Sequence, residues 1–210
     1  MAHANSPKRR AVMDAAMTLF LAQGYGATSM EQVARTANVS KATLYAYFES
    51  KDQLFAIIVS ERKTLFYDAA FETEVTDLHA ALTAIGQTFL RFMLREQTLA
   101  IYRVAVAESA RFPELGRAFF ENGPQRGHTI FAEWLERQQA AGLVSVPVPR
   151  IAAYQFMTLL RGCVFLRATL AVGPEPSDSE INETVAAAVD TWMAAFGRPR
   201  TAQPADTATA

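Results

Sequence analysis

A segment near the N-terminus, residues 28–48, carries side chains whose types and spacing suit contacts with DNA. It reads as a short helix, a tight turn and a second short helix, a unit that projects its second helix outward to enter a major groove. Hydroxyls and lysine can bind phosphate oxygens or base edges. No acid occurs in residues 40–48, and the donors that we expect to contact DNA there are Ser40, Lys41, Thr43, Tyr45 and Tyr47.

Two further residues lie at expected helix N-termini, where free backbone amides and partial positive charge favour phosphate groups. Thr28 opens the second helix and Lys51 opens the fourth, and we expect both to contact the DNA backbone. The basic run from Lys8 to Arg10 is expected to form an arm along the phosphates or in the minor groove.

The charge is unevenly distributed along the chain. Residues 1–63 hold every lysine, and their eight Lys and Arg against five Asp and Glu give a net +3, which leaves −4 for the remainder of a chain of net charge −1. A basic head on an acidic body suits a protein that touches a polyanion at one end. Chance segregation of a small charge is the alternative.

Other kinds of chemistry find little support. We see no nucleophile motif, no glycine-rich phosphate loop and no paired histidine–carboxylate spacing, so an enzyme is disfavoured. His3, His79 and His128 are far apart in the sequence, and neither a metal nor a cofactor is expected. Cys163 lies in an apolar run and is expected to be buried, with a redox sensor as the alternative.

Helical periodicity runs through nearly the whole chain and strand signals are scarce, which predicts an all-α fold. Gly24 is expected to end the first helix, and Asn38 to take positive φ in the turn after the second. The second helix is expected to begin at Thr28 or Ser29, with a capping box between Thr28 and Glu31. The expected helices cover residues 7–23, 28–37, 41–48, 51 to the low seventies, 77–95, 97–111, 113–121, 127–141, 149–171 and 179–196.

Residues 9–54 resemble the DNA-binding domain of the TetR/AcrR family of bacterial regulators. The resemblance implies an all-helical homodimer with about nine helices per subunit, binding to double-stranded operator DNA, and repression relieved by a small molecule. It also implies phosphate contacts by Thr28 and Lys51, and groove contacts by Lys41, Thr43 and Tyr45, joined by Ser40 and Tyr47. The family often has glycine where this chain has Asn38 and Ala42. The matching residues are Val12, Ala15, Phe20, Gly24-Tyr25, Thr28, Val33-Ala34, Ala37, Val39-Ser40-Lys41, Thr43-Leu44-Tyr45, Tyr47-Phe48, Lys51 and Leu54.

The remainder of the chain is similar to the AefR-like class of C-terminal domains within this family, on residues 108–116, Phe119-Phe120 and Gly123-Pro124. Aromatic residues are dense from Phe66 to Trp134, which together with the resemblance predicts an apolar effector pocket among helices four to seven. Plain core packing is the alternative for each aromatic. The expected lining is Phe66, Phe89, Tyr102, His128, Phe131 and Arg161, with His128 as the first choice of polar group, before Tyr102 and Arg161.

The last two helices carry apolar residues around most of their circumference and are expected to form a four-helix dimer interface that includes Val189 and Trp192. Packing wholly within one monomer is the alternative. Arg161 and Arg167 lie inside the apolar stretch 151–172, so a buried helix is expected there, and no membrane partner.

We therefore expect three parts: a helix-turn-helix domain with its basic arm over 1–50, a helical effector-binding and dimerisation domain over 51–197, and a disordered tail over 198–210. The absence of a signal-peptide pattern and the single cysteine predict a cytoplasmic location. A ligand that tilts the fourth helix is expected to separate the two DNA-reading heads. An architectural DNA-binding protein without a sensor is the remaining alternative.

Overall fold

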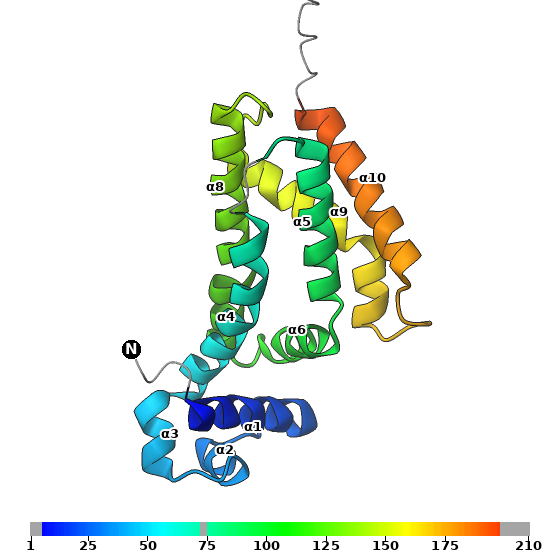
Figure 1. Ribbon diagram of the computed structural model, residues 1–210. Coiled ribbons are helices and arrows are strands. Elements are labelled where there is room, and N and C mark those ends of the chain that lie inside the picture. The colour runs from blue at the N-terminus through cyan, green and yellow to red at the C-terminus, as the bar shows by residue number, and fades with distance from the viewer. Residues whose placement is uncertain (1–5, 72–74, 198–210) are drawn as a thin grey trace, which may run out of the picture.

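The structure is a computed structural model that describes residues 6–71 and 75–197, without the side chains of residues 62–70 (Figure 1). All the named elements in these ranges are helical, and the expectation of an all-α fold is confirmed. Counting α7, η1 and α8 as one interrupted helix gives nine. The elements are α1 (Pro7–Gln23), α2 (Met30–Thr36), α3 (Lys41–Tyr47), α4 (Lys51–Ala70), α5 (Leu78–Met93), α6 (Glu96–Glu108), α7 (Pro113–Phe120), η1 (Glu121–Gln125), α8 (Arg126–Ala140), α9 (Pro149–Thr169) and α10 (Asp178–Phe196).

Serines begin two helices of the head, which we define as residues 6–50, and the long helix that follows it. Ser29, Ser40 and Ser50 are the N-caps of α2, α3 and α4, and each side-chain oxygen accepts a hydrogen bond from the backbone N–H three residues later. Gln32 reaches back to the N–H of Ser29 and completes a capping box. The expected box between Thr28 and Glu31 is therefore wrong by one residue.

Backbone geometry explains the two tight links of the head. Gly24 has a φ of 85° at the end of α1, and Asn38 has a φ of 53° between α2 and α3, as the sequence predicts. The N–H of Val39 donates to the carbonyl of Ala34 at 3.0 Å, which closes the turn. These links set the angles at which α2 and α3 leave the preceding helix.

Two apolar cores organise the molecule. The first joins α1, α2 and α3 to Leu54, Phe55 and Ile58 on the first half of α4 and to residues of α6 and α7. The second lies among α5, α8, α9 and α10, which form the body. Figure 1 shows α4 rising from the head into the body, and α6 lying across the end of the body nearest the head. The expected boundary after residue 50 therefore falls inside the first core, while the expected tail 198–210 lies outside the described residues.

α9 is kinked at Gly162, where φ is 44° and ψ is −153°. An L side chain rarely adopts this conformation, so glycine permits a change of direction inside the helix. Arg161 before the kink is partly buried, whereas Cys163 after it is exposed. The expectation of a buried Cys163 is wrong because the kink turns that position outward.

Candidate DNA-binding surface and effector pocket

The outer face of α3 carries the side chains that the sequence assigns to DNA. The Tyr45 side chain is 46% exposed, which is unusual for a large ring. Leu44, the preceding residue, is buried in the core of the head. The hydroxyls of Ser40 and Thr43 lie 2.8 Å apart at the start of the helix, where Ser40 also caps it. This face can offer a ring and two hydroxyls to a groove.

Lys41 is exposed and already has a partner. Its Nζ lies 3.0 Å from Oε1 of Glu31 on α2, and the hydrogen bond from Lys41 lowers the pKa of the Glu31 carboxyl below its ordinary value. The sequence did not predict this ion pair, because the two residues meet only when α2 and α3 cross. A phosphate would compete with Glu31 for this ammonium.

Tyr47 lies half-buried and the Tyr47 hydroxyl is 2.9 Å from the hydroxyl of Ser6, ahead of α1. Arg9 also turns inward, because it forms an ion pair with Glu61 on α4 and its guanidinium lies 5.5 Å from the centre of the Phe48 ring. Lys8 and Arg10 are exposed. The expected basic arm therefore reduces to these two residues among those that the structure describes.

Thr28 is buried, with 2% of its surface exposed. The Thr28 hydroxyl donates to the carbonyl of Gly24 at 2.8 Å and accepts from Nε2 of Gln23 at 3.2 Å. Its hydrogen is thus committed within the head, and this arrangement does not support the expected phosphate contact through the Thr28 hydroxyl.

Lys51 lies against the same link. Its Nζ donates to the carbonyls of Tyr25 and Thr28 at 2.7 Å and 2.9 Å, and it lies 4.2 Å from the centre of the Tyr25 ring. Burial lowers the pKa of the Lys51 ammonium below its ordinary value. An ammonium has three donors, so one N–H remains after these two bonds.

The body contacts the head at this link. The Phe112 ring, ahead of α7, lies 5.5 Å from the Tyr25 ring, and a Cβ on Gly26 would lie 2.7 Å from Cζ of Phe112. A Cβ on Gly24 would lie 2.6 Å from Oε1 of Glu108, at the end of α6. Glycines at these positions therefore allow the corner between α6 and α7 to pack closely against the link between α1 and α2. The sequence patterns include Gly24, Glu108 and Phe112 but do not predict that these residues meet.

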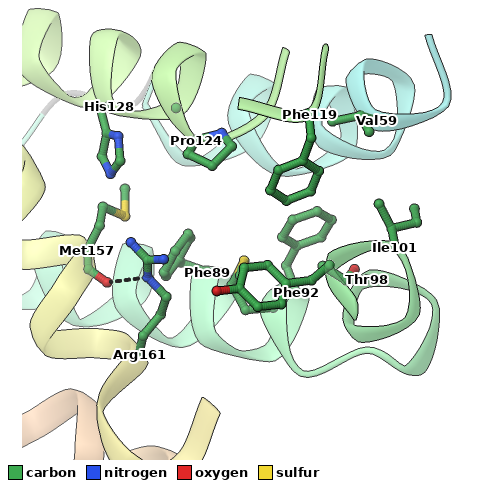
Figure 2. Close-up of a pocket in the computed structure, with 13 residues that line it drawn as sticks. Val59, Phe89, Phe92, Thr98, Ile101, Phe119, Pro124, His128, Met157 and Arg161 are labelled. Carbon is green, nitrogen blue, oxygen red and sulfur yellow. Dashed lines mark hydrogen bonds between the residues drawn. The ribbon is translucent and has the colours of Figure 1, made fainter. Parts of the chain in front are cut away.

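An apolar pocket opens between the two cores, with a cavity of about 70 Å³. Figure 2 shows Phe89 and Phe92 on one side, and Phe119 and Pro124 on the other. Its described lining comes from α4 to α9 and includes η1, a wider set of elements than the expected helices four to seven: Val59, Phe89, Phe92, Met93, Thr98, Ile101, Tyr102, Phe119, Pro124, Gly127, His128, Met157 and Arg161.

The structure brings together four of the six residues expected in the pocket: Phe89, Tyr102, His128 and Arg161. Phe131 is instead fully buried in the second core, with its ring 5.5 Å from that of Trp134 and 5.2 Å from that of Phe156, so its assignment to the pocket is wrong. The side chain of Phe66 lies outside the described residues. Met157 was missed because its orientation depends on how α9 packs against α8.

A second apolar surface lies along α9 and α10. Leu159 and Leu166 on α9 and Leu170 directly after it are exposed. A groove between the two helices is lined by Tyr154, Gln155, Thr158, Leu159, Thr191, Trp192, Ala195 and Phe196. Val189 and Trp192 are instead 0% and 1% exposed, packed in the second core, where Nε1 of Trp192 donates to the carbonyl of Ala152 at 3.0 Å. Val189 is therefore closed off inside the single chain, whereas Trp192 also borders the groove, and the place of the dimer interface stays a prediction.

The described part of the chain contains no group of three or more His, Cys, Asp or Glu side chains that could hold a metal ion. Its helices include none that is both long enough and apolar enough to cross a bilayer.

Comparisons with known proteins agree with this architecture. Residues 12–58 match the N-terminal domain of bacterial regulatory proteins of the TetR family, and residues 80–198 match the C-terminal domain of AefR-like transcriptional repressors. The transcriptional regulator YvkB of Bacillus subtilis is 28% identical over 156 residues, covering 74% of this chain and 80% of that protein.

Solved structures show the same fold. A TetR-family regulator from Mesorhizobium loti superposes with a TM-score of 0.78 at 26% identity, covering 91% of this chain and 97% of its own. The flavonoid-responsive regulator FrrA superposes with a TM-score of 0.73 at 35% identity, covering 92% and 98%. The expectation of a regulator rather than an enzyme is thereby confirmed: the chain belongs to the TetR family of DNA-binding transcriptional regulators.

Proposed function

We propose that this chain is a homodimeric repressor that binds an inverted-repeat operator and leaves it when an aromatic effector fills the pocket. One observation carries the proposal: α6 and α7 line the pocket, and the corner between them presses on the head at Gly24 and Gly26. The similarity to AefR-like repressors and to a flavonoid-responsive regulator supports both the sign of the regulation and the aromatic class of effector.

On the DNA side, α3 of each subunit would enter a major groove. Tyr45 would meet base edges or sugars, while Ser40, Thr43 and Lys41 would donate to phosphates or bases. Lys51 would give its third N–H to a phosphate without leaving the two carbonyls. Two heads on one face of DNA must lie about 34–36 Å apart, or a multiple of that distance.

On the effector side, the cavity of about 70 Å³ is small beside the roughly 300–1,000 Å³ typical of ligand sites. An aromatic ligand must therefore widen it by moving its walls. Phe119 stands on α7, whose preceding residue Phe112 contacts the Tyr25 ring, so the widened state would shift the head. Only a ligand that binds this shifted state more tightly than the DNA-bound state can release DNA. A tenfold loss of operator affinity needs a coupling free energy of about 1.4 kcal/mol.

The test uses the full-length protein and an operator selected from random DNA, with affinity measured by fluorescence anisotropy. We expect Tyr45→Ala to lose at least about tenfold on the operator and much less on random DNA, whereas Tyr45→Phe keeps most of the affinity. A flavonoid panel should release the wild-type complex. Selection of no preferred sequence, or equal binding by Tyr45→Ala, would contradict the DNA assignment, and failure of every aromatic compound would contradict the effector assignment.

A further inference from the structure

Among the described lining residues, Arg161 is the one with a permanent charge, and most of the others are apolar. Arg161 stands on α9 just before the kink, and Figure 2 shows its guanidinium between Met157 and Phe89, below the ring of His128. Nε of Arg161 donates to the carbonyl of Met157 at 3.3 Å. Within the described part of the chain this is the one hydrogen bond recorded from the guanidinium, which has five N–H donors.

Among the described residues, none forms an ion pair with Arg161. Among the described residues that line the pocket none is acidic, and the ion pairs of the described chain use other arginines: Arg9, Arg91 and Arg167. Burial lowers the pKa of the Arg161 guanidinium below its ordinary value. Because arginine stays protonated in proteins, the positive charge is held in a poorly solvated place.

One contact orients this charge, because the bond to the Met157 carbonyl fixes the Nε side of the planar guanidinium. The aromatic rings of Phe89, Phe92 and Tyr102 line the same space. A planar fork beside aromatic rings matches an aromatic molecule that ends in a planar anionic group.

We propose that the effector is an aromatic acid: its rings lie among the phenylalanines of the pocket, and its ionised carboxylate binds the guanidinium of Arg161. This inference rests on the proposed function and narrows its effector to anions. The acid would accept hydrogen bonds from the nitrogens of Arg161 that the Met157 carbonyl leaves open, so a neutral analogue of equal shape forfeits the charge-assisted bonds.

The probes are three aromatic carboxylates, 2-naphthoate, trans-cinnamate and biphenyl-4-carboxylate, each paired with its primary amide. Binding to the full-length protein is measured by calorimetry near neutral pH, where the acids are ionised. We expect at least one acid to bind about tenfold or more tightly than its amide. Arg161→Met should abolish that preference by weakening the acid and sparing the amide, and Arg161→Lys should restore part of it.

The matched control is Arg117→Met, which removes an exposed arginine from α7 and should leave the acid preference unchanged. Unaltered operator binding by Arg161→Met shows that this variant is folded. Equal affinity for acid and amide, binding of the amides alone, or binding of no acid in the panel overturns the proposal. If neutral aromatic compounds still release the operator, the repressor function stands and only the acid assignment fails.

Discussion

At the scale of single residues, polar side chains in the head and at the start of α4 have two roles: they stabilise the head, and they are proposed to contact DNA. Lys51 bonds two carbonyls of the link between α1 and α2, and Lys41 pairs with Glu31. Both lysines were expected as DNA contacts, and the structure adds an internal partner for each. Substitutions at these positions therefore change the free protein as well as the complex.

Lys51→Met tests this double role. We expect the free energy of unfolding to fall by about 1–3 kcal/mol, because two partly buried carbonyls lose their donor. The slope of log affinity against log salt should also flatten by roughly one charge if the third N–H meets a phosphate. Urea unfolding and operator binding across a salt series measure the two effects. A lower stability with an unchanged slope would confine Lys51 to a structural role.

Glu31→Gln should strengthen operator binding by about two- to fivefold, because it frees Lys41 and removes a negative charge beside the DNA. Since the pKa of Glu31 is lowered in the folded state, its pairing with Lys41 is present above the ordinary carboxyl pKa and is lost as the pH falls through the lowered value. Operator binding by the wild type should therefore strengthen as the pH falls through the lowered pKa of Glu31. The Glu31→Gln variant should not show this strengthening.

Glu49→Gln is the matched control for this effect, because it makes the same charge change at an exposed site between α3 and α4. Anisotropy at fixed ionic strength compares the two variants. An equal gain in both would mean that net charge alone, and not release of Lys41, explains the result.

At the scale of elements, the corner between α6 and α7 connects the pocket to the head. Tyr102 on α6 and Phe119 on α7 line the cavity, and their rings are 5.9 Å apart. Glu108 and Phe112 from the same corner face Gly24 and Gly26. A change in the pocket thus has a short packed path to the link that positions α2.

Phe112→Ala should weaken this connection. We expect effector affinity and operator affinity each to change by less than about threefold, while the effector's reduction of operator affinity shrinks, because the ring that packs on Tyr25 is gone. Phe120→Ala removes an exposed ring from the other end of α7 and serves as the control. Full release by effector in Phe112→Ala would show that coupling runs through another contact, such as α4.

At the scale of the whole molecule, function as proposed requires two subunits whose heads face one DNA duplex. The exposed leucines of α9 and the groove between α9 and α10 offer an apolar face for a second copy of the chain. The buried faces of the same helices belong to the second core. The two faces predict different consequences of introducing a charge.

Leu166→Asp should split the dimer without unfolding the subunit, because residue 166 is 57% exposed in the single chain and would be buried only on association. A buried unpaired carboxylate costs several kcal/mol, so association should weaken by about a hundredfold or more. Val189→Asp should unfold the subunit instead. Sedimentation and circular dichroism separate the two outcomes.

Val106→Asp, on the exposed side of α6, is the control for the dimer prediction. A dimeric Leu166→Asp protein would move the interface elsewhere, and a wild-type monomer at micromolar concentration would contradict the homodimer itself.

Sequence by itself determined the head and the positions of the helices. The positive φ of Asn38 and the apolar spacing that buries Leu44 while exposing Tyr45 act within a few residues, so local patterns predict them. The same holds for the breaks at Gly24 and Pro113, and for the all-α fold class.

Only the tertiary structure decided which way the side chains of the body point. α9 and α10 are apolar on several faces, so periodicity did not reveal that Val189 and Trp192 belong to the core while Leu166 stays outside. Phe131 and Arg161 are likewise separated, one into the core and one into the pocket, by packing between helices distant in sequence. The inward turn of Lys51 has the same cause, because its partners lie 23 and 26 residues away. Contacts of this kind depend on how whole helices cross, which no short stretch of sequence specifies.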